Sequence, residues 1–143
     1  MTVKAILSRK GRDVTTIAPT ANLSDAVKLL AERRIGAVVV TGADNRVAGI
    51  LSERDIVRTL AARGAAALDD NVAAVMTRKV TTCSEADTVV AIMERMTAGK
   101  FRHVPVVDQG QLVGVISIGD VVKHRVEEIE GETSALREYI ATA

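Results

Sequence analysis

Hydrophobic residues follow the same helical spacing in two segments of the chain that lie 66 residues apart. In residues 23–30 and again in residues 89–96, apolar side chains occupy positions i, i+3, i+4 and i+7, which predicts one amphipathic helix in each segment with a single buried face. The two sets are Leu23, Ala26, Val27 and Leu30, and Val89, Ile92, Met93 and Met96.

The segments around these helices also recur. VTTIAPTANL at 14–23 matches VTTCSEADTV at 80–89, and IGAVVV at 35–40 matches FRHVPV at 101–106. After a polar turn, GILSERDIV at 49–57 matches GVISIGDVV at 114–122. The turns GADNR and DQGQ suit hairpins because they are rich in Gly, Asp and Asn. Each copy is therefore predicted to run extended segment, helix, strand, tight turn, strand, helix.

A unit this small does not bury its own sheet face, so two copies are expected to pack face to face about a pseudo-twofold axis, with two related clefts. The predicted division is residues 1–66 for the first repeat with its lead-in, 67–126 for the second repeat, and 127–143 for a helical tail. The lead-in AILSRK at 5–10 resembles AVMTRK at 74–79. A helix is expected to end at Gly64, before a short linker.

The tail carries apolar residues at helical spacing. Val122, Val126 and Ile129 share one face, Gly131 is expected to interrupt the helix, and Leu136 and Ile140 indicate a second short piece. Two alternatives remain open for this stripe: a contact in an oligomer, or packing against the sheet of the same chain.

Composition narrows the class of protein. Apolar residues make up 48% of the chain but aromatics only 1%, so the core consists of aliphatic side chains, which favour a sheet covered by helices. The net charge of +1 argues against a main role in binding nucleic acid or an anionic membrane. The lone Cys83 excludes an intramolecular disulfide, and it is expected to be a small buried hydrophobe. No apolar run reaches the length of a bilayer span, so we expect a soluble, cytoplasmic protein.

Ser-x-x-Asp recurs at the start of the last helix of each copy, as Ser52 with Asp55 and as Ser117 with Asp120. One interpretation is a capping box that only starts a helix. The other is a ligand site, because a helix N-terminus favours an anion such as phosphate and a carboxylate accepts hydrogen bonds from the two hydroxyls of a ribose.

The ordered set of motifs, occurring twice over residues 3–125, resembles two successive CBS (cystathionine-β-synthase) domains, the tandem known as a Bateman module. The resemblance implies an α+β fold with β-α-β-β-α in each repeat, binding of adenosine nucleotides between the repeats, and a disc-shaped homodimer. AMP is the first expectation, followed by ADP, ATP or NAD(H), with an unknown downstream protein as the partner of an energy or redox sensor.

The resemblance also implies site residues, with each acid facing mainly the other repeat. Ser52, Arg54 and Asp55 are expected to face Val80, Thr82, Arg102, His103, Val104 and Pro105. Ser117 and Asp120 are expected to face Val14, Thr16, Gly36, Ala37 and Val38. Because Arg102 and His103 serve only the first of these clefts, the cleft at Asp55 is predicted to be the more phosphate-selective.

The remaining candidates favour a binding protein without catalysis. No phosphate-binding loop, metal-ligand cluster or nucleophile with a partner base occurs in the sequence, so no enzyme activity is expected. His124, within KHR at 123–125, is predicted to lie on a solvated basic face. The main alternative function is an interaction scaffold without ligand, in which both Ser-x-x-Asp motifs are only helix caps.

Overall fold

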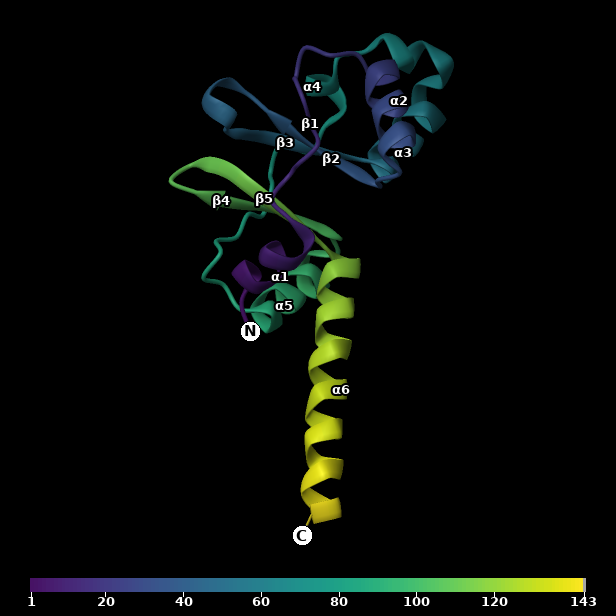
Figure 1. Ribbon diagram of the computed structural model, residues 1–143. Helices are drawn as coiled ribbons and strands as arrows, with labels where there is room; N and C mark the ends of the chain where they lie inside the picture. The colour runs from purple at the N-terminus through teal and green to yellow at the C-terminus, as the bar shows by residue number, and fades with distance from the viewer. Residues whose placement is uncertain (143) are drawn as a thin grey trace.

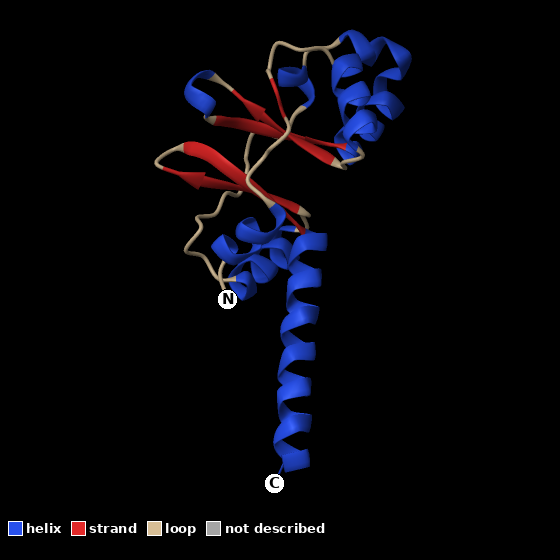
Figure 2. Ribbon diagram, viewed as in Figure 1, coloured by secondary structure: helices blue, strands red, loops and turns tan. Residues whose placement is uncertain are grey.

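Two β-hairpins lie against each other at the centre of the computed structural model, which describes residues 1–142, and helices cover their outer sides (Figures 1 and 2). The hairpins meet near their turns, where the Asn45 side chain donates a hydrogen bond of 2.9 Å to the Leu112 carbonyl. This arrangement agrees with the predicted face-to-face packing of two repeats.

The first repeat forms a three-stranded sheet in the order β1-β2-β3, with helices α2 and α3. Strand β1 runs parallel to β2, and β2 pairs antiparallel with β3. In the turn between them, Asp44 and Asn45 adopt positive φ angles, which short polar side chains tolerate. The bounds are β1 (Thr16–Ile17), α2 (Leu23–Arg33), β2 (Ala37–Thr41), η1 (Ala43–Asn45), β3 (Val47–Ser52) and α3 (Glu53–Arg63).

The second repeat follows the same order with α5 (Val89–Gly99), β4 (His103–Asp108), β5 (Gln111–Ser117) and α6 (Ile118–Thr142). Gln109 and Gly110 form its two-residue turn, both with positive φ, as hairpin turns of the favoured type require. Cys83 bridges Val106 in parallel, just as Ile17 pairs with Val40 in the first repeat. Cys83 is 5% exposed and burial raises its pKa to about 11, which confirms the predicted buried position.

Both predicted amphipathic helices are present, and each begins at a side-chain cap. Asn22 accepts a hydrogen bond from the Asp25 amide, and Thr88 accepts one from the Ala91 amide. The predicted buried face of α2 was wrong at Val27, which is 37% exposed. This residue lies at the edge of the apolar face, whose other members, Leu23, Ala26 and Leu30, are buried.

The segment that precedes each repeat packs into the core of the other repeat. Helix α1 (Val3–Lys10) precedes the first repeat but packs its Val3 and Leu7 into the core of the second. Helix α4 (Val72–Val75) precedes the second repeat, and Val72 packs with Met76 into the core of the first. Each core therefore uses residues from both repeats, so the limits 1–66 and 67–126 describe units of sequence and not separate cores.

The tail differs from the prediction. Helix α6 runs without interruption from Ile118 to Thr142, and Gly131 lies inside it. Glycine in a helix interior costs only about 1 kcal/mol relative to alanine, so one such residue does not end a long helix. All residues from 129 to 142 are exposed, so this part of the tail does not pack onto its own sheet.

The connection between the repeats has more structure than predicted. Helix α3 ends at Arg63 with Gly64 as its C-cap, which confirms the predicted end. The expected linker then forms a 3-10 helix, η2 (Gly64–Asp69), which buries Ala67. Within residues 1–142, no helix has both the length and the apolar character that crossing a bilayer requires.

Candidate ligand-binding cleft

A cleft with a volume of about 690 Å³ opens between the two repeats. The first repeat contributes the start of β2 and the junction of β3 with α3. The second contributes the segment before Cys83, the end of α5 with the start of β4, and the junction of β5 with α6. The lining residues are 36–37, 50, 52–55, 58, 77, 79–81, 99–103 and 117–119.

Basic side chains predominate in this cleft. Arg54, Arg58, Lys79, Lys100 and Arg102 line it, against the two carboxylates of Glu53 and Asp55. All five basic residues are exposed, so their charges remain solvated. A concave surface with excess positive charge concentrates anions.

Ser52 and Asp55 form a complete capping box at the start of α3. The Ser52 amide donates to Asp55 Oδ2 at 3.0 Å, and the Asp55 amide donates to Ser52 Oγ at 3.3 Å. The Ser52 hydroxyl also donates to Oδ2, at 3.1 Å. Within residues 1–142, the other carboxylate oxygen, Oδ1, accepts only a long hydrogen bond of 3.4 Å from Thr77 Oγ1. The cap thus occupies one oxygen of Asp55 and leaves the second able to accept bonds from a ligand.

His103 begins β4 and lies half-buried beside Gly36, across the boundary between the repeats. Burial holds the pKa of His103 below its usual range, aided by the charges of Lys10 and Arg102 and opposed by Asp120 and Glu53. The imidazole is therefore neutral at pH 7, where it can donate one hydrogen bond and accept another. Positive charge in the cleft comes from the arginines and lysines.

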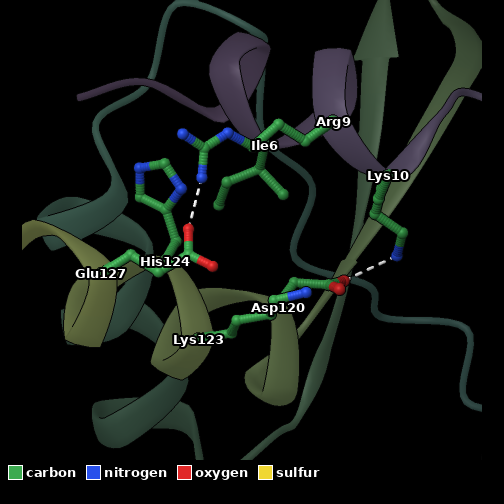
Figure 3. A pocket seen from close by; sticks show the side chains of 7 residues that line it. All are labelled: Ile6, Arg9, Lys10, Asp120, Lys123, His124 and Glu127. Carbon is green, nitrogen blue, oxygen red and sulfur yellow. Dashed lines mark hydrogen bonds and ion pairs between the residues drawn. The ribbon is translucent and has the colours of Figure 1, made fainter.

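The second box has the same geometry but different surroundings. The Ser117 amide donates to Asp120 Oδ2 at 2.9 Å, and the Asp120 amide donates to Ser117 Oγ at 3.2 Å. Lys10 from α1 then donates to the same Oδ2 at 2.6 Å (Figure 3). Burial raises the pKa of Asp120, but the hydrogen bonds from Lys10 and the Ser117 amide outweigh it and leave the pKa below its usual value.

Asp120 lines a separate, smaller cavity of about 120 Å³ between α1 and α6. Two ion pairs, Lys10 with Asp120 and Arg9 with Glu127, cross from α1 to α6 there (Figure 3). The carboxylate is thus already paired with a cation of its own chain.

The structure brings together only part of the predicted site. Ser52, Arg54 and Asp55 share the large cleft with Val80, Arg102 and His103. The remaining residues predicted for this cleft do not line it: Thr82 is exposed outside it, and Val104 and Pro105 are buried.

The predicted surroundings of Asp120 are not assembled. Gly36, Ala37 and Ser117 line the large cleft, which Asp120 does not. Val14, Thr16 and Val38 line neither cavity, and Val38 is a core residue. Lys10 lies beside Asp120 instead.

Several lining residues were missed by sequence reasoning. Arg58 follows Arg54 by one helical turn, a spacing that places both on one face of α3 and was visible in the sequence. Thr77 and Lys79 lie in the recurring lead-in AVMTRK, which was not assigned to the site, and Lys100 belongs to no motif. The Lys10–Asp120 pair joins residues 110 positions apart and has no local signal.

The prediction for His124 was wrong. This residue is 4% exposed, and within residues 1–142 its Nε2 has no hydrogen-bond partner. The nearest acidic oxygen, Oε1 of Glu128, lies 3.9 Å away. Helix α6 packs against α1 and α5, and His124 lies on the buried side with Val121, one turn earlier.

Comparison with known proteins identifies the family. The model of the CBS domain matches twice, over residues 3–62 and 72–127. The chain belongs to the CBS-domain family. A CBS-domain protein from Agrobacterium tumefaciens has a solved structure that is 51% identical in sequence, with a TM-score of 0.83 over 87% of this chain and 92% of that one. The predicted α+β CBS-pair fold is therefore confirmed.

Two further relatives bear on function. A CBS-domain protein from Pyrobaculum aerophilum, solved in complex with AMP, is 32% identical with a TM-score of 0.75, over 84% of this CBS pair and 89% of that chain. A mitochondrial CBS domain-containing protein of Arabidopsis thaliana is 36% identical over 120 residues, which are 81% of this chain. The chain spans 58% of that relative's length.

Proposed function

We propose that this CBS pair is a regulatory protein that binds an adenine nucleotide, in the first place AMP, in the cleft beside Asp55. The observation that carries the proposal is the composition of this cleft, in which five basic side chains surround a carboxylate at a helix N-terminus. Its volume of about 690 Å³ lies within the roughly 300–1,000 Å³ of small-molecule sites.

Each part of a nucleotide finds matching chemistry. Oδ1 of Asp55 accepts hydrogen bonds from the ribose hydroxyls, since the cap uses only Oδ2. Arg102 binds phosphate oxygens in bidentate fashion, supported by Lys79 and Arg58. The base packs among apolar groups such as Val80.

The AMP complex of the Pyrobaculum relative supports the choice of ligand. ADP, ATP and NAD(H) share the adenosine part and remain in the proposal, because they differ in the number and placement of phosphates. The Asp120 side is the weaker candidate, since Lys10 already neutralises its carboxylate.

Regulation follows from the place of the cleft. Both repeats line it, so a bound nucleotide contacts both and favours the relative orientation that fits it best. The signal would pass to a downstream protein partner. The proposal requires no catalytic step and includes a homodimer in the cytoplasm.

Isothermal titration calorimetry with AMP, ATP and NADH tests binding. Asp55→Asn keeps an oxygen for the Ser52 amide but removes the charge, and we expect it to weaken AMP binding. Arg102→Ala is expected to weaken it by about tenfold to a hundredfold, as for a charge-assisted hydrogen bond of about 1.5–3 kcal/mol. Asp120→Asn is the matched control in the second repeat and should bind AMP like the wild type. Absence of heat with all three nucleotides would contradict the proposal.

The alternative function is a scaffold for other proteins, and the completeness of both capping boxes favours it. Asp55→Ala distinguishes the two functions. A scaffold predicts loss of about 1 kcal/mol of stability, typical of a lost cap, with nucleotide affinity unchanged. The sensor predicts loss of both.

A further inference from the structure

Helix α6 extends far beyond the rest of the molecule (Figures 1 and 2). It comprises 25 residues, or about 37 Å at 1.5 Å per residue. Every residue from 129 to 142 is exposed. Because isolated helices of about 12–15 residues are marginally stable in water, a helical segment this long and unsupported needs a partner.

An apolar seam runs along the exposed side of α6. Its members recur at alternating steps of four and three residues, which is the heptad spacing of a two-stranded coiled coil. Its five hydrophobic members are between 47% and 65% exposed. The seam consists of Val122, Val126, Ile129, Leu136 and Ile140, with Thr133 completing the repeat.

The seam is separate from the surface that α6 buries within its own chain. That inner surface contains Val121 and His124, which are buried, and Glu128, which is half-buried. At 3.6 residues per turn, the centre of the seam lies roughly 125° around the helix from the centre of that inner surface. A second helix can therefore pack on the seam without displacing the contacts of α6 with α1 and α5.

We propose that this seam pairs with the same seam of a second copy of the chain, in a parallel two-stranded coiled coil. Charges beside the seam select the orientation. In a parallel pair, the residues just before Val126 and Thr133 lie at the edge of the seam. Each faces the residue five positions further along the partner helix. Arg125 then faces the partner's Glu130, and Glu132 faces the partner's Arg137.

In an antiparallel pair whose two seams overlap along their full length, like charges lie opposite each other. Lys123 would face the partner's Arg137, and Glu130 would face the partner's Glu130. Like charges across such an interface are unfavourable. Arg125 is also bonded to Glu128 of its own helix at 2.8 Å, so in the pair it bridges two carboxylates. Charge complementarity between copies thus favours a second copy of this chain over an unrelated partner.

Analytical ultracentrifugation of the full chain tests the pairing. We expect the wild type to be a dimer and Leu136→Glu with Ile140→Glu to shift the protein towards monomer. These residues are exposed, so the CBS pair itself should still fold. Circular dichroism and denaturant unfolding of each variant check this. Ser134→Glu with Ala141→Glu adds the same charge to the same helix off the seam and should stay dimeric. A monomeric wild type, or a dimer unaffected by the seam substitutions, overturns the proposal.

Cross-linking tests the orientation. Ile140→Cys places a thiol at equivalent points of two parallel helices, where mild oxidation should produce a covalent dimer. The native Cys83 is buried with a raised pKa, so the wild type should not cross-link under the same conditions. A dimer in which Ile140→Cys does not cross-link overturns the parallel arrangement. These outcomes are independent of nucleotide binding, which calorimetry measures on the same variants.

Discussion

At the scale of single residues, Asp55 and Asp120 occupy equivalent positions in the two repeats but have different electrostatic surroundings. Both accept hydrogen bonds from the serine of their own capping box. Asp120 also pairs with Lys10, whereas Lys79, the equivalent of Lys10 in the second lead-in, lines the large cleft. Two copies of one motif have thus produced one carboxylate paired within the chain and one beside an open cleft.

Replacing Lys10 tests this difference. In Lys10→Met, the pKa of Asp120 should rise towards its ordinary value, and NMR titration of the carboxyl carbon measures the change. Because the folded state lowers this pKa, the pair stabilises the fold above the ordinary carboxyl pKa, and that stability disappears as pH falls through the lowered pKa. Both groups are partly exposed, so we expect a loss of no more than about 1 kcal/mol at pH 7. A larger loss at acidic pH than at pH 7 would contradict this assignment.

His103 predicts a second pH dependence, at higher pH. Its folded-state pKa lies below the reference value of 6.5, mainly through burial. The unfolded chain therefore binds a proton first, and stability should fall as pH decreases from about 6.5 through the lowered pKa. Urea unfolding of the wild type and of His103→Gln at pH 7.5 and pH 5.5 measures this. The glutamine variant should lose less stability between the two pH values, and an equal loss would exclude His103 as the cause.

At the scale of elements, the segments that precede the two repeats pass close to the hairpins at two equivalent glycines, Gly49 and Gly114. At Gly49 in β3, an added Cβ would lie 2.7 Å from both the Met76 sulfur and the Thr77 carbonyl oxygen. At Gly114 in β5, it would lie 2.8 Å from a methyl of Leu7. These close approaches explain why glycine recurs here, a repetition visible in the sequence whose cause was not.

Alanine at the two glycines should have unequal effects. Gly49→Ala meets a backbone carbonyl and should destabilise the fold by about 1–3 kcal/mol, as overpacking does. Gly114→Ala meets the end of a flexible leucine and should cost less. Guanidinium unfolding of both variants measures the difference. Equal costs would mean that Thr77 moves as easily as the Leu7 side chain.

Elements with strong local patterns were predicted well, because spacing and turn chemistry act within a few residues. The helices at 23–33 and 89–99 and the two hairpins follow from such patterns. His124 was misjudged because it lies on the side of α6 that packs in the protein interior, next to residues of α1 that are far away in sequence. The break expected at Gly131 was wrong because one glycine costs too little to end a helix of this length.

At the scale of the whole molecule, the two repeats line one large cleft between them. Residues 36–37, 50, 52–55 and 58 come from one repeat, and residues 77, 79–81, 99–103 and 117–119 come from the other. A ligand that contacts both sides should therefore stabilise the assembled pair and not one repeat alone.

Thermal and denaturant unfolding with AMP tests this linkage. At a free AMP concentration 100 times Kd, the free energy of unfolding should increase by about 2.7 kcal/mol. Arg102→Ala measured at the same AMP concentration should gain less, and both repeats should unfold in one transition. Stabilisation of one transition among two would instead show that AMP binds a single repeat.

The sequence by itself determined the repeats, their helices and hairpins, and the Ser-x-x-Asp caps, because these depend on spacing and hydrogen bonds over a few residues. Arg102 was likewise singled out from the sequence, and it lines the cleft with Asp55. Only the tertiary structure decided which lead-in completes which core, and that Lys10 rather than the first repeat's β-strands neighbours Asp120. Those outcomes depend on contacts between residues up to 110 positions apart, for which burial and charge pairing act only once the chain has folded.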